Sequence, residues 1–318
     1  MSASLIARPM SLVMESRMCR IPSESAFVQV SIGMPVFNGE AFLADALNDL
    51  TAQTFADFEL LISDNCSTDT TEAICREFAS RDVRIRYVKQ SSNIGAIPNF
   101  QFVLDQAVGQ YFMWAAADDK WSANWVESLI AEAKAGGCLA YGRVQTIDKK
   151  NQLTQHPANE RWFDYSGNRL FRRIKYFLEP GILGKANPIY GIAATSELKL
   201  KGVSWIANEG GRGDMIFLYE LLGRLNIRAV SGAVLYKRIH EKSEGATTGS
   251  HTTLRRGKLL RLWRFIGDMI RSPMIPSYLA QSGPIESVFL ILAYPMCVVR
   301  NVFYALRAKI SRLRNKRF

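Results

Sequence analysis

The chain has 318 residues, 48% of them hydrophobic, which is enough apolar material to bury one large domain and an appendage. Its five cysteines are an odd, scattered set without paired zinc spacing, which excludes a disulfide framework and indicates a reducing compartment. The formal net charge of +11 is confined to residues 251–318, which hold 13 Lys and Arg against 2 Asp and Glu, while the rest holds 27 of each. Residues 1–26 lack the continuous apolar core of a signal peptide, and we expect a disordered leader there.

From residue 28 onward, apolar runs alternate with apolar residues at helical spacing. The runs predict strands, the spaced residues predict helices, and polar loops follow the strands. In chain order, the expected strands and helices cover residues 28–36, 43–50, 58–62, 74–78, 85–88 and 100–107. This alternation predicts an α/β fold with a single open, mostly parallel sheet flanked by helices.

The next apolar run begins at Tyr111 and ends in two adjacent carboxylates, Asp118 and Asp119. Open α/β sheets bind ligands at the carboxyl ends of their strands, and paired carboxylates there suit a divalent metal that holds a phosphorylated substrate. The alternative is a turn in which Asp119 or Ser122 caps the following helix. Successive strand residues point to opposite faces, so the two carboxylates are expected to have different roles.

Four motifs, taken in order, resemble those of the family 2 glycosyltransferases. They are Met34-Pro35-Val36-Phe37-Asn38-Gly39-Glu40, Ser63-Asp64-Asn65-Cys66-Ser67-Thr68-Asp69, Asn93-Ile94-Gly95 and Ala117-Asp118-Asp119. The resemblance covers about residues 28–129 and continues more weakly to 240. It implies an A-type, Rossmann-like glycosyltransferase fold that binds a nucleotide sugar, although Ala117 stands where the family's metal motif has its first Asp.

By this resemblance, Asp119 is expected to bind Mg²⁺ or Mn²⁺, and Asp118 to contact the ribose or the surroundings of the metal. Such an ion stabilises the negative charge of a departing nucleoside diphosphate as a Lewis acid. Asp64 resembles the family's acid that hydrogen-bonds the base or ribose of the nucleotide. The loops add three candidates for the same crevice, Asn38, Asn93 and Gly95. Turn chemistry alone is the alternative explanation for these three.

Inversion at the anomeric carbon needs a base beside the acceptor hydroxyl. Asp214 follows a Gly-rich segment at the start of an apolar helix and resembles the family's catalytic base, with an N-cap as its alternative role and Glu209 as the reserve candidate. Arg238 and His240 resemble residues that contact the donor phosphates or the metal, although a lone His has no partner at metal-ligand spacing. Residues 187–192 resemble the edge strand that borders the acceptor pocket.

The tail combines the excess positive charge with two apolar stretches. Residues 254–271 are basic and amphipathic, whereas 288–299 are interrupted by Pro295 and fall short of the roughly 20 residues that cross a bilayer as a helix. We expect the tail to lie in a membrane interface with its Lys and Arg on anionic lipid. A helical cap packed on the catalytic domain is the alternative. The tail lacks a recognised module for nucleic-acid binding.

The sequence thus predicts an inverting, metal-dependent glycosyltransferase of cell-surface polysaccharide or lipid-linked glycan synthesis, peripheral on the cytoplasmic face of the membrane. Its expected partners are a UDP-, GDP- or dTDP-linked donor, a saccharide or lipid-linked saccharide acceptor and an anionic membrane, without nucleic acid. A non-catalytic nucleotide-sugar or glycan-binding protein of the same fold is the alternative. The expected divisions are the leader over 1–26, a catalytic domain over 27–250 with a nucleotide-sugar half (27–130) and an acceptor half (131–250), and the tail over 251–318.

Overall fold

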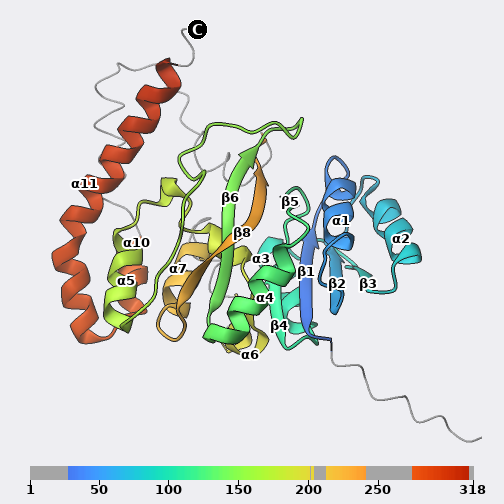
Figure 1. Cartoon of the computed structure of the whole chain (residues 1–318), viewed down its shortest axis with the longest axis horizontal. Helices are drawn as coiled ribbons and strands as arrows, with labels where there is room; N and C mark the ends of the chain where they lie inside the picture. The colour runs from blue at the N-terminus through green and yellow to red at the C-terminus, as the bar shows by residue number, and fades with distance from the viewer. Residues whose placement is uncertain (1–27, 201, 204–212, 241–273, 315–318) are drawn as a thin grey trace, which may run out of the picture.

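The computed structural model describes residues 28–200, 202–203, 213–240 and 274–314. Two sheets and their surrounding helices make up this part of the chain (Figure 1). Three of the predicted features lie outside the described residues, namely the leader over 1–26, the reserve base Glu209 and the amphipathic segment over 254–271.

The larger sheet has five strands in the order β3-β2-β1-β4-β7. Its parallel strands are β1 (Val30–Val36), β2 (Phe58–Asp64), β3 (Ile85–Lys89) and β4 (Tyr111–Trp114), and the short β7 (Ala193–Ala194) pairs antiparallel with β4. The helices between the parallel strands are α1 (Leu43–Thr51), α2 (Thr71–Arg81) and α3 (Ala96–Asp105). The predicted α/β fold with a mostly parallel sheet is confirmed.

Burial explains why these segments form strands and helices. The central strands are continuous apolar runs because both faces of the sheet are covered, and β1 is buried along almost its whole length. On α1 the buried residues Leu43, Ala46, Leu47 and Leu50 recur at helical spacing and form one face. The polar residues that follow the parallel strands are thereby brought to one edge of the sheet.

A second sheet of three strands has the order β5-β8-β6. Its members are β5 (Lys120–Trp121), β6 (Leu139–Ile147) and β8 (Ile227–Arg238), with β6 and β8 parallel and β5 antiparallel to β8. The helix α4 (Trp125–Gly136) packs against β6 and β8. The predicted single sheet is therefore divided into two, because the chain turns at Asp118 and Asp119 to pair with β8. That pairing brings the end of β8 beside the two carboxylates.

The predicted edge strand over 187–192 is wrong in its secondary structure. Residues Asn187–Tyr190 form a 3-10 helix, η2, and β7 begins only at Ala193. Pro188 explains the difference, because it has no N–H for a strand ladder and favours the first turn of a helix.

The C-terminal part is helical. Its elements are α5 (Arg169–Leu178), the 3-10 helix η1 (Gly181–Leu183), α6 (Thr195–Lys199), α7 (Gly213–Leu221), α10 (Met274–Ala280) and α11 (Pro284–Arg314). The predicted interruption at Pro295 is wrong, since α11 runs through this residue as one helix of 31 residues. Pro295 is exposed, so its ring meets no packed core on that side. In Figure 1, α11 stands beside α5 at the opposite edge of the molecule from β3 and α2.

Candidate functional site

The loops after β1 and β2 are tied together by short polar contacts. Asn38 adopts a left-handed backbone conformation (φ 49°), and its Oδ1 accepts a hydrogen bond from the Thr68 N–H at 2.9 Å. The Asn38 N–H donates to Ser67 Oγ at 2.9 Å, and the Gly39 N–H donates to Thr71 Oγ1 at 2.9 Å. Asn38 thus serves the turn, which is the alternative role that the sequence left open.

Asp64, at the end of β2, is fully buried beneath this loop. Its Oδ1 accepts from the Ser67 N–H at 2.8 Å, and its Oδ2 accepts from the Tyr87 hydroxyl at 2.8 Å. Burial and the hydrogen bond to Asp64 raise the pKa of Tyr87, so this hydroxyl stays a donor at neutral pH. The predicted contact of Asp64 with a base or ribose is not supported, because Asp64 is fully buried and is not among the residues that line the adjoining pocket.

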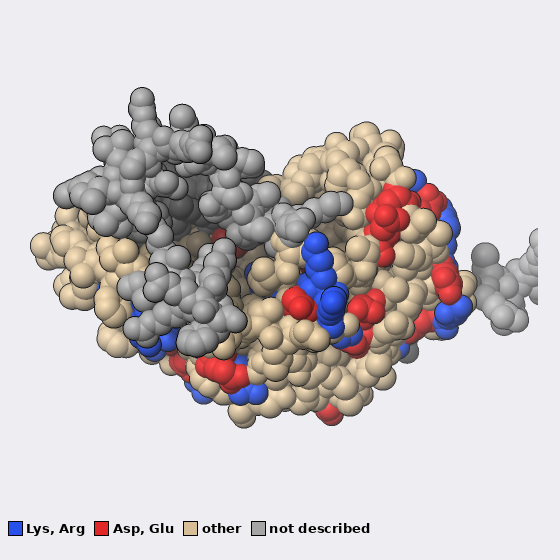
Figure 2. All heavy atoms as spheres, turned by 90° about the horizontal axis from the view of Figure 1, so that it is seen from above, with Lys and Arg blue, Asp and Glu red and all other residues tan. Residues whose placement is uncertain are grey.

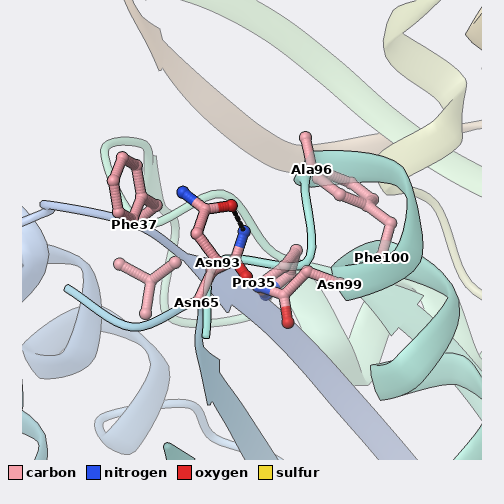
Figure 3. Close-up of a pocket in the computed structure, with 8 residues that line it drawn as sticks. Pro35, Phe37, Asn65, Asn93, Ala96, Asn99 and Phe100 are labelled. Atoms are coloured by element: carbon pink, nitrogen blue, oxygen red, sulfur yellow. Dashed lines mark hydrogen bonds between the residues drawn. The ribbon is translucent and has the colours of Figure 1, made fainter. Parts of the chain in front are cut away.

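Asn65, the next residue, faces a pocket of about 220 Å³ between the ends of β1 and β2 and the start of α3 (Figure 3). Its Nδ2 donates to Asn93 Oδ1 at 3.0 Å, and its Oδ1 accepts from the Ile94 N–H at 2.8 Å. Gly95 has a φ of 88°, which favours glycine, and its N–H also donates to Asn93 Oδ1. The lining residues are Pro35, Val36, Phe37, Asn65, Asn93, Ala96, Asn99 and Phe100.

This pocket has the chemistry of a site for a planar heteroaromatic ring. Phe37 is 49% exposed and presents an aromatic surface at its rim, as Figure 3 shows. Asn93 already uses its Oδ1 within the loop, and its Nδ2 donates to no protein atom in the described part of the chain. The sequence reasoning found Asn93 and missed Asn65 and Phe37 as pocket residues, although both stand in the quoted motifs.

The two carboxylates after β4 point to different surroundings. Asp118 is a third exposed, and its Oδ2 lies 2.8 Å from His240 Nε2. Asp119 is 2% exposed, and its Oδ1 accepts from the Arg238 N–H at 2.8 Å. Burial, and next the charge of Asp118, raise the pKa of Asp119 to about 7. The geometry does not support Asp119 as the metal ligand and Asp118 as the outer residue, because the accessible carboxylate is that of Asp118.

Arg238 is buried, and its guanidinium bonds to the surrounding backbone rather than facing solvent. Its side chain is 1% exposed and donates from Nε to the Asp118 carbonyl at 2.8 Å and from Nη1 to the Asp148 carbonyl at 3.0 Å. The guanidinium also lies over the Phe42 ring, 4.4 Å from its centroid. The predicted contact of Arg238 with donor phosphates is therefore not supported. Its contacts hold in place the backbone that carries Asp118.

The remaining ligand prediction, His240, lies beside Asp118 with 11% of its side chain exposed. Within the described residues, no three His, Cys, Asp or Glu side chains form a cluster arranged to hold a metal ion. Asp118 and His240 nevertheless supply an oxygen and a nitrogen that converge at 2.8 Å. Mg²⁺ and similar ions take only one or two carboxylates when substrate phosphates complete the shell. This donor pair therefore fits an ion that arrives with a diphosphate.

The loop after β1 joins the pocket to this pair. Phe37 borders the pocket at one end of the loop. At the other end, the Phe42 ring lies 5.2 Å from the His240 ring. A Cβ added to Gly39 would stand 3.7 Å from Ala117 Cβ, so the middle of the loop lies beside the turn that carries Asp118. A ligand with an aromatic end and an anionic end can therefore reach both regions along one loop.

Asp214 belongs to a different part of the molecule, at the start of α7. Its Oδ1 accepts from the Met215 N–H at 2.7 Å, as an acid at a helix start does. Gly181 of η1 packs close by, since an added Cβ there would lie 3.3 Å from Met215 Cε. Burial lowers the pKa of Lys185 to about 8, and the charge of Asp214 is among those that oppose this shift. Asp214 thus lies within electrostatic reach of a buried cation.

The first half of the chain matches a known protein family. Residues 31–188 match the family model described as Glycosyl transferase family 2. One curated relative is the GalNAc(5)-diNAcBac-PP-undecaprenol beta-1,3-glucosyltransferase of Campylobacter jejuni, 28% identical over 128 residues, or 40% of this chain and 41% of that protein. Another is the putative teichuronic acid biosynthesis glycosyltransferase TuaG of Bacillus subtilis, which is 32% identical over 101 residues. These residues make up 32% of this chain and 40% of TuaG. The matched region spans about two fifths of the length of these relatives.

Solved structures share the fold over nearly the whole chain. The crystal structure of S. aureus TarS 1-349 in complex with UDP-GlcNAc has a TM-score of 0.54 at 14% identity, covering 88% of this chain and 92% of that chain. The mannosyltransferase PcManGT from Pyrobaculum calidifontis, in complex with GDP-Man and Mn2+, has a TM-score of 0.50 at 15% identity. The match covers 90% of this chain and 76% of PcManGT. At these identities the likeness establishes the fold alone.

Proposed function

This chain belongs to the family 2 glycosyltransferases, and from that premise we propose that it transfers a sugar from a nucleotide-sugar donor to a hydroxyl acceptor with inversion. The observation that carries the proposal is the position of one loop, residues 37–42. It borders an amide-lined pocket at one end and the Asp118–His240 pair at the other. A nucleoside diphosphate has a planar base and an anionic diphosphate, and these match the two regions.

In the proposed complex, the base stacks on Phe37 and hydrogen-bonds to the amides of Asn65 and Asn93. Asp118 and His240 hold the divalent ion, Mg²⁺ or Mn²⁺. When bound, the ion supplies Lewis-acid stabilisation of the charge that develops on the departing diphosphate. Support for a nucleotide-sugar donor comes from TarS in complex with UDP-GlcNAc and from PcManGT in complex with GDP-Man and Mn2+.

Asp214 is the proposed base that takes the proton from the acceptor hydroxyl. Its carboxylate accepts a hydrogen bond from the Met215 N–H at the start of α7. That contact and the start of α7 favour the ionised form that a base requires. For the acceptor we propose a lipid-linked saccharide, since the C. jejuni relative is named as a glucosyltransferase of an undecaprenol-linked saccharide.

The proposal is tested in two steps. First, UDP, GDP and dTDP are each added with Mn²⁺ in a thermal-shift screen, because a selective ligand stabilises the native state by mass action. Second, the corresponding nucleotide sugars are assayed for release of the free diphosphate, with and without EDTA. We expect one nucleotide to stabilise the protein and its sugar to turn over only with the metal. Stabilisation without turnover on any acceptor would instead identify a binding protein, and undiminished turnover in EDTA would overturn the metal site.

A further inference from the structure

The helix α11 packs on the catalytic domain through the side that carries its charges. The buried Glu286 carboxylate forms an ion pair with the buried guanidinium of Arg173 on α5. Further along the helix, Arg300 Nη2 lies 3.6 Å from Glu179 Oε2. Glu286 and Arg300 are the charged residues of the sequence between 284 and 306. Both therefore face the protein and leave the opposite side of the helix without a charge.

That opposite side is an exposed apolar stripe, which we call the α11 stripe. Its members are Ile285 (72% exposed), Val288 (57%), Phe289 (45%), Leu292 (72%), Met296 (57%), Val299 (67%) and Phe303 (57%). Their spacing of three and four residues places them on one face over about five turns. A helix on a water-exposed surface has the reverse arrangement, with charges outward and apolar residues inward. Continuous apolar surface of this kind marks an interaction site.

We propose that the α11 stripe inserts into the interfacial region of an anionic membrane, with the helix axis parallel to the bilayer plane. Lipid is the environment in which an uncharged, aliphatic and aromatic outer face is favourable. By length and composition alone, Pro284–Arg307 is apolar and long enough to cross a membrane, with 24 residues, a mean hydropathy of 1.7 and 6% of it buried. The composition of α11 therefore favours contact with lipid. Its orientation relative to the bilayer follows from how it packs on the domain.

The packing favours an in-plane helix over a spanning one. The contacts from Glu286 to Arg300 hold α11 against the domain for about 21 Å of helix length. A spanning helix would have to leave the domain, and a buried guanidinium at Arg173 would then lose its carboxylate. An in-plane helix keeps both ion pairs while its outer face enters the lipid.

Charge favours lipid over a second copy of the chain as the occupant. Residues 251–318 hold 13 Lys and Arg against 2 Asp and Glu, with six of the basic residues between 307 and 317. Two such tails repel each other, whereas anionic headgroups attract them. The rest of the chain is neutral, and the face in Figure 2 shows basic and acidic side chains beside one another rather than a patch of one sign. The surface is separate from the proposed donor site, so this inference does not rest on the proposed reaction.

Both alternatives from the sequence are thus combined, since α11 caps the domain on one side and presents a docking face on the other. Removing the tail is therefore a poor test, because it would unpair Arg173 and take Tyr278 out of the core. A double variant on the stripe, Leu292→Glu with Val299→Glu, leaves the ion pairs intact. The matched control is Val83→Glu, at a fully exposed valine between α2 and β3, at the far edge of the molecule.

The full-length proteins are floated with phosphatidylcholine vesicles that contain or lack phosphatidylglycerol. We expect the wild type and Val83→Glu to bind the anionic vesicles, more weakly at high salt, and the double variant to lose binding about 10-fold or more. Thermal melting and nucleotide binding of the double variant should match the wild type, which separates this test from the proposed function. Equal vesicle binding by wild type and double variant, or none by the wild type, would overturn the proposal. So would a wild-type dimer in solution that the double variant dissociates, because a second copy would then cover the stripe.

Orientation is tested by quenching with brominated lipids. An environment-sensitive fluorophore is placed at position 285, 292, 299 or 303, one position at a time. An in-plane helix predicts similar depths at the four positions. Depths that change steadily along the helix would show a spanning segment and contradict the in-plane arrangement.

Discussion

The ends of β2 and β4 carry the same kind of residue pair, with the order reversed. After β2, Asp64 is buried and bonded within the protein, and Asn65 faces the pocket. After β4, Asp118 is accessible beside His240, and Asp119 is buried under the Arg238 backbone. In both places one polar residue supports the loop, and its neighbour borders a proposed binding region, although Asn65 itself is only 3% exposed. Exposure separates Asp118 from Asp119, whereas Asp64 and Asn65 are both buried and differ in that Asn65 lines the pocket. The position of each side chain, and not its chemical type, therefore decides which member of a pair can bind.

The same rule separates the charged residues of β8. Arg238 has its guanidinium under Asp118 and over Phe42, whereas His240, two residues later, reaches the accessible carboxylate. Arg238 is already bonded to two carbonyls and supports the site, and His240 beside it is the group proposed to contact the ligand. The residues that only contact other protein groups should thus control stability, and those that line the pocket or lie at Asp118 and His240 should control activity.

The largest effect is expected from a residue outside both strand ends, Asp214. Asp214→Asn keeps the side-chain shape and removes the proton acceptor, so kcat should fall by about 10²- to 10⁴-fold with the nucleotide affinity little changed. Steady-state transfer and calorimetric binding measure the two quantities. Glu209→Gln is the matched control, and if that variant loses activity while Asp214→Asn keeps it, the base must be reassigned.

The accessible member of the β4 pair comes next. Asp118→Ala should lower kcat/KM by at least about 100-fold, or roughly 2.7 kcal/mol of transition-state stabilisation, because the proposed ion loses its carboxylate. Asp119→Asn preserves the acceptor for the Arg238 N–H and should stay within about 10-fold of the wild type. Diphosphate release is measured for both variants over a Mn²⁺ titration. If Asp119→Asn loses more activity than Asp118→Ala, Asp119 is the metal ligand, as the resemblance implied. The contrast between the two members of the β4 pair would then be wrong.

The sequence was sufficient for the α/β fold and for which polar loops lie at one edge of the larger sheet, because alternation and four ordered motifs specify the strands and the loops that follow them. It could not choose within Asp64-Asn65 or Asp118-Asp119, since the direction of each side chain depends on how the strand ends and turns. It predicted an apolar stretch over 288–299 at a membrane interface but missed the unbroken helix and the side that packs on the domain. A proline inside an apolar run is typical of a break, and the partners of Glu286 and Arg300 are distant in the chain. Local sequence patterns predicted the strands and helices, whereas the role of each side chain depends on contacts between residues that are distant in the chain.

The buried member of the β2 pair should mainly affect stability. Asp64→Asn places an amide N–H₂ against the Ser67 N–H or the Tyr87 hydroxyl, so the free energy of unfolding should fall by about 1–3 kcal/mol. Urea unfolding measures the change. Glu77→Gln, in an exposed ion pair on α2, is the control and should shift stability by less than about 0.5 kcal/mol. An Asp64→Asn protein as stable as the control would show that the bonds to Asp64 are dispensable.

The smallest effect is expected from the member of the β2 pair that lines the pocket, Asn65. Asn65→Ala removes an amide that lines the pocket and bonds to Asn93, so the Kd of the nucleoside diphosphate selected in the screen should rise by about 5- to 10-fold. Calorimetry at a temperature where both proteins are folded measures the change. Asn48→Ala, at an exposed position on α1, should leave the Kd unchanged. If folded Asp64→Asn loses nucleotide affinity while Asn65→Ala keeps it, the acid contacts the nucleotide after all. The division between supporting and binding residues would then fail at β2, and the pocket beside Asn65 would not hold the base.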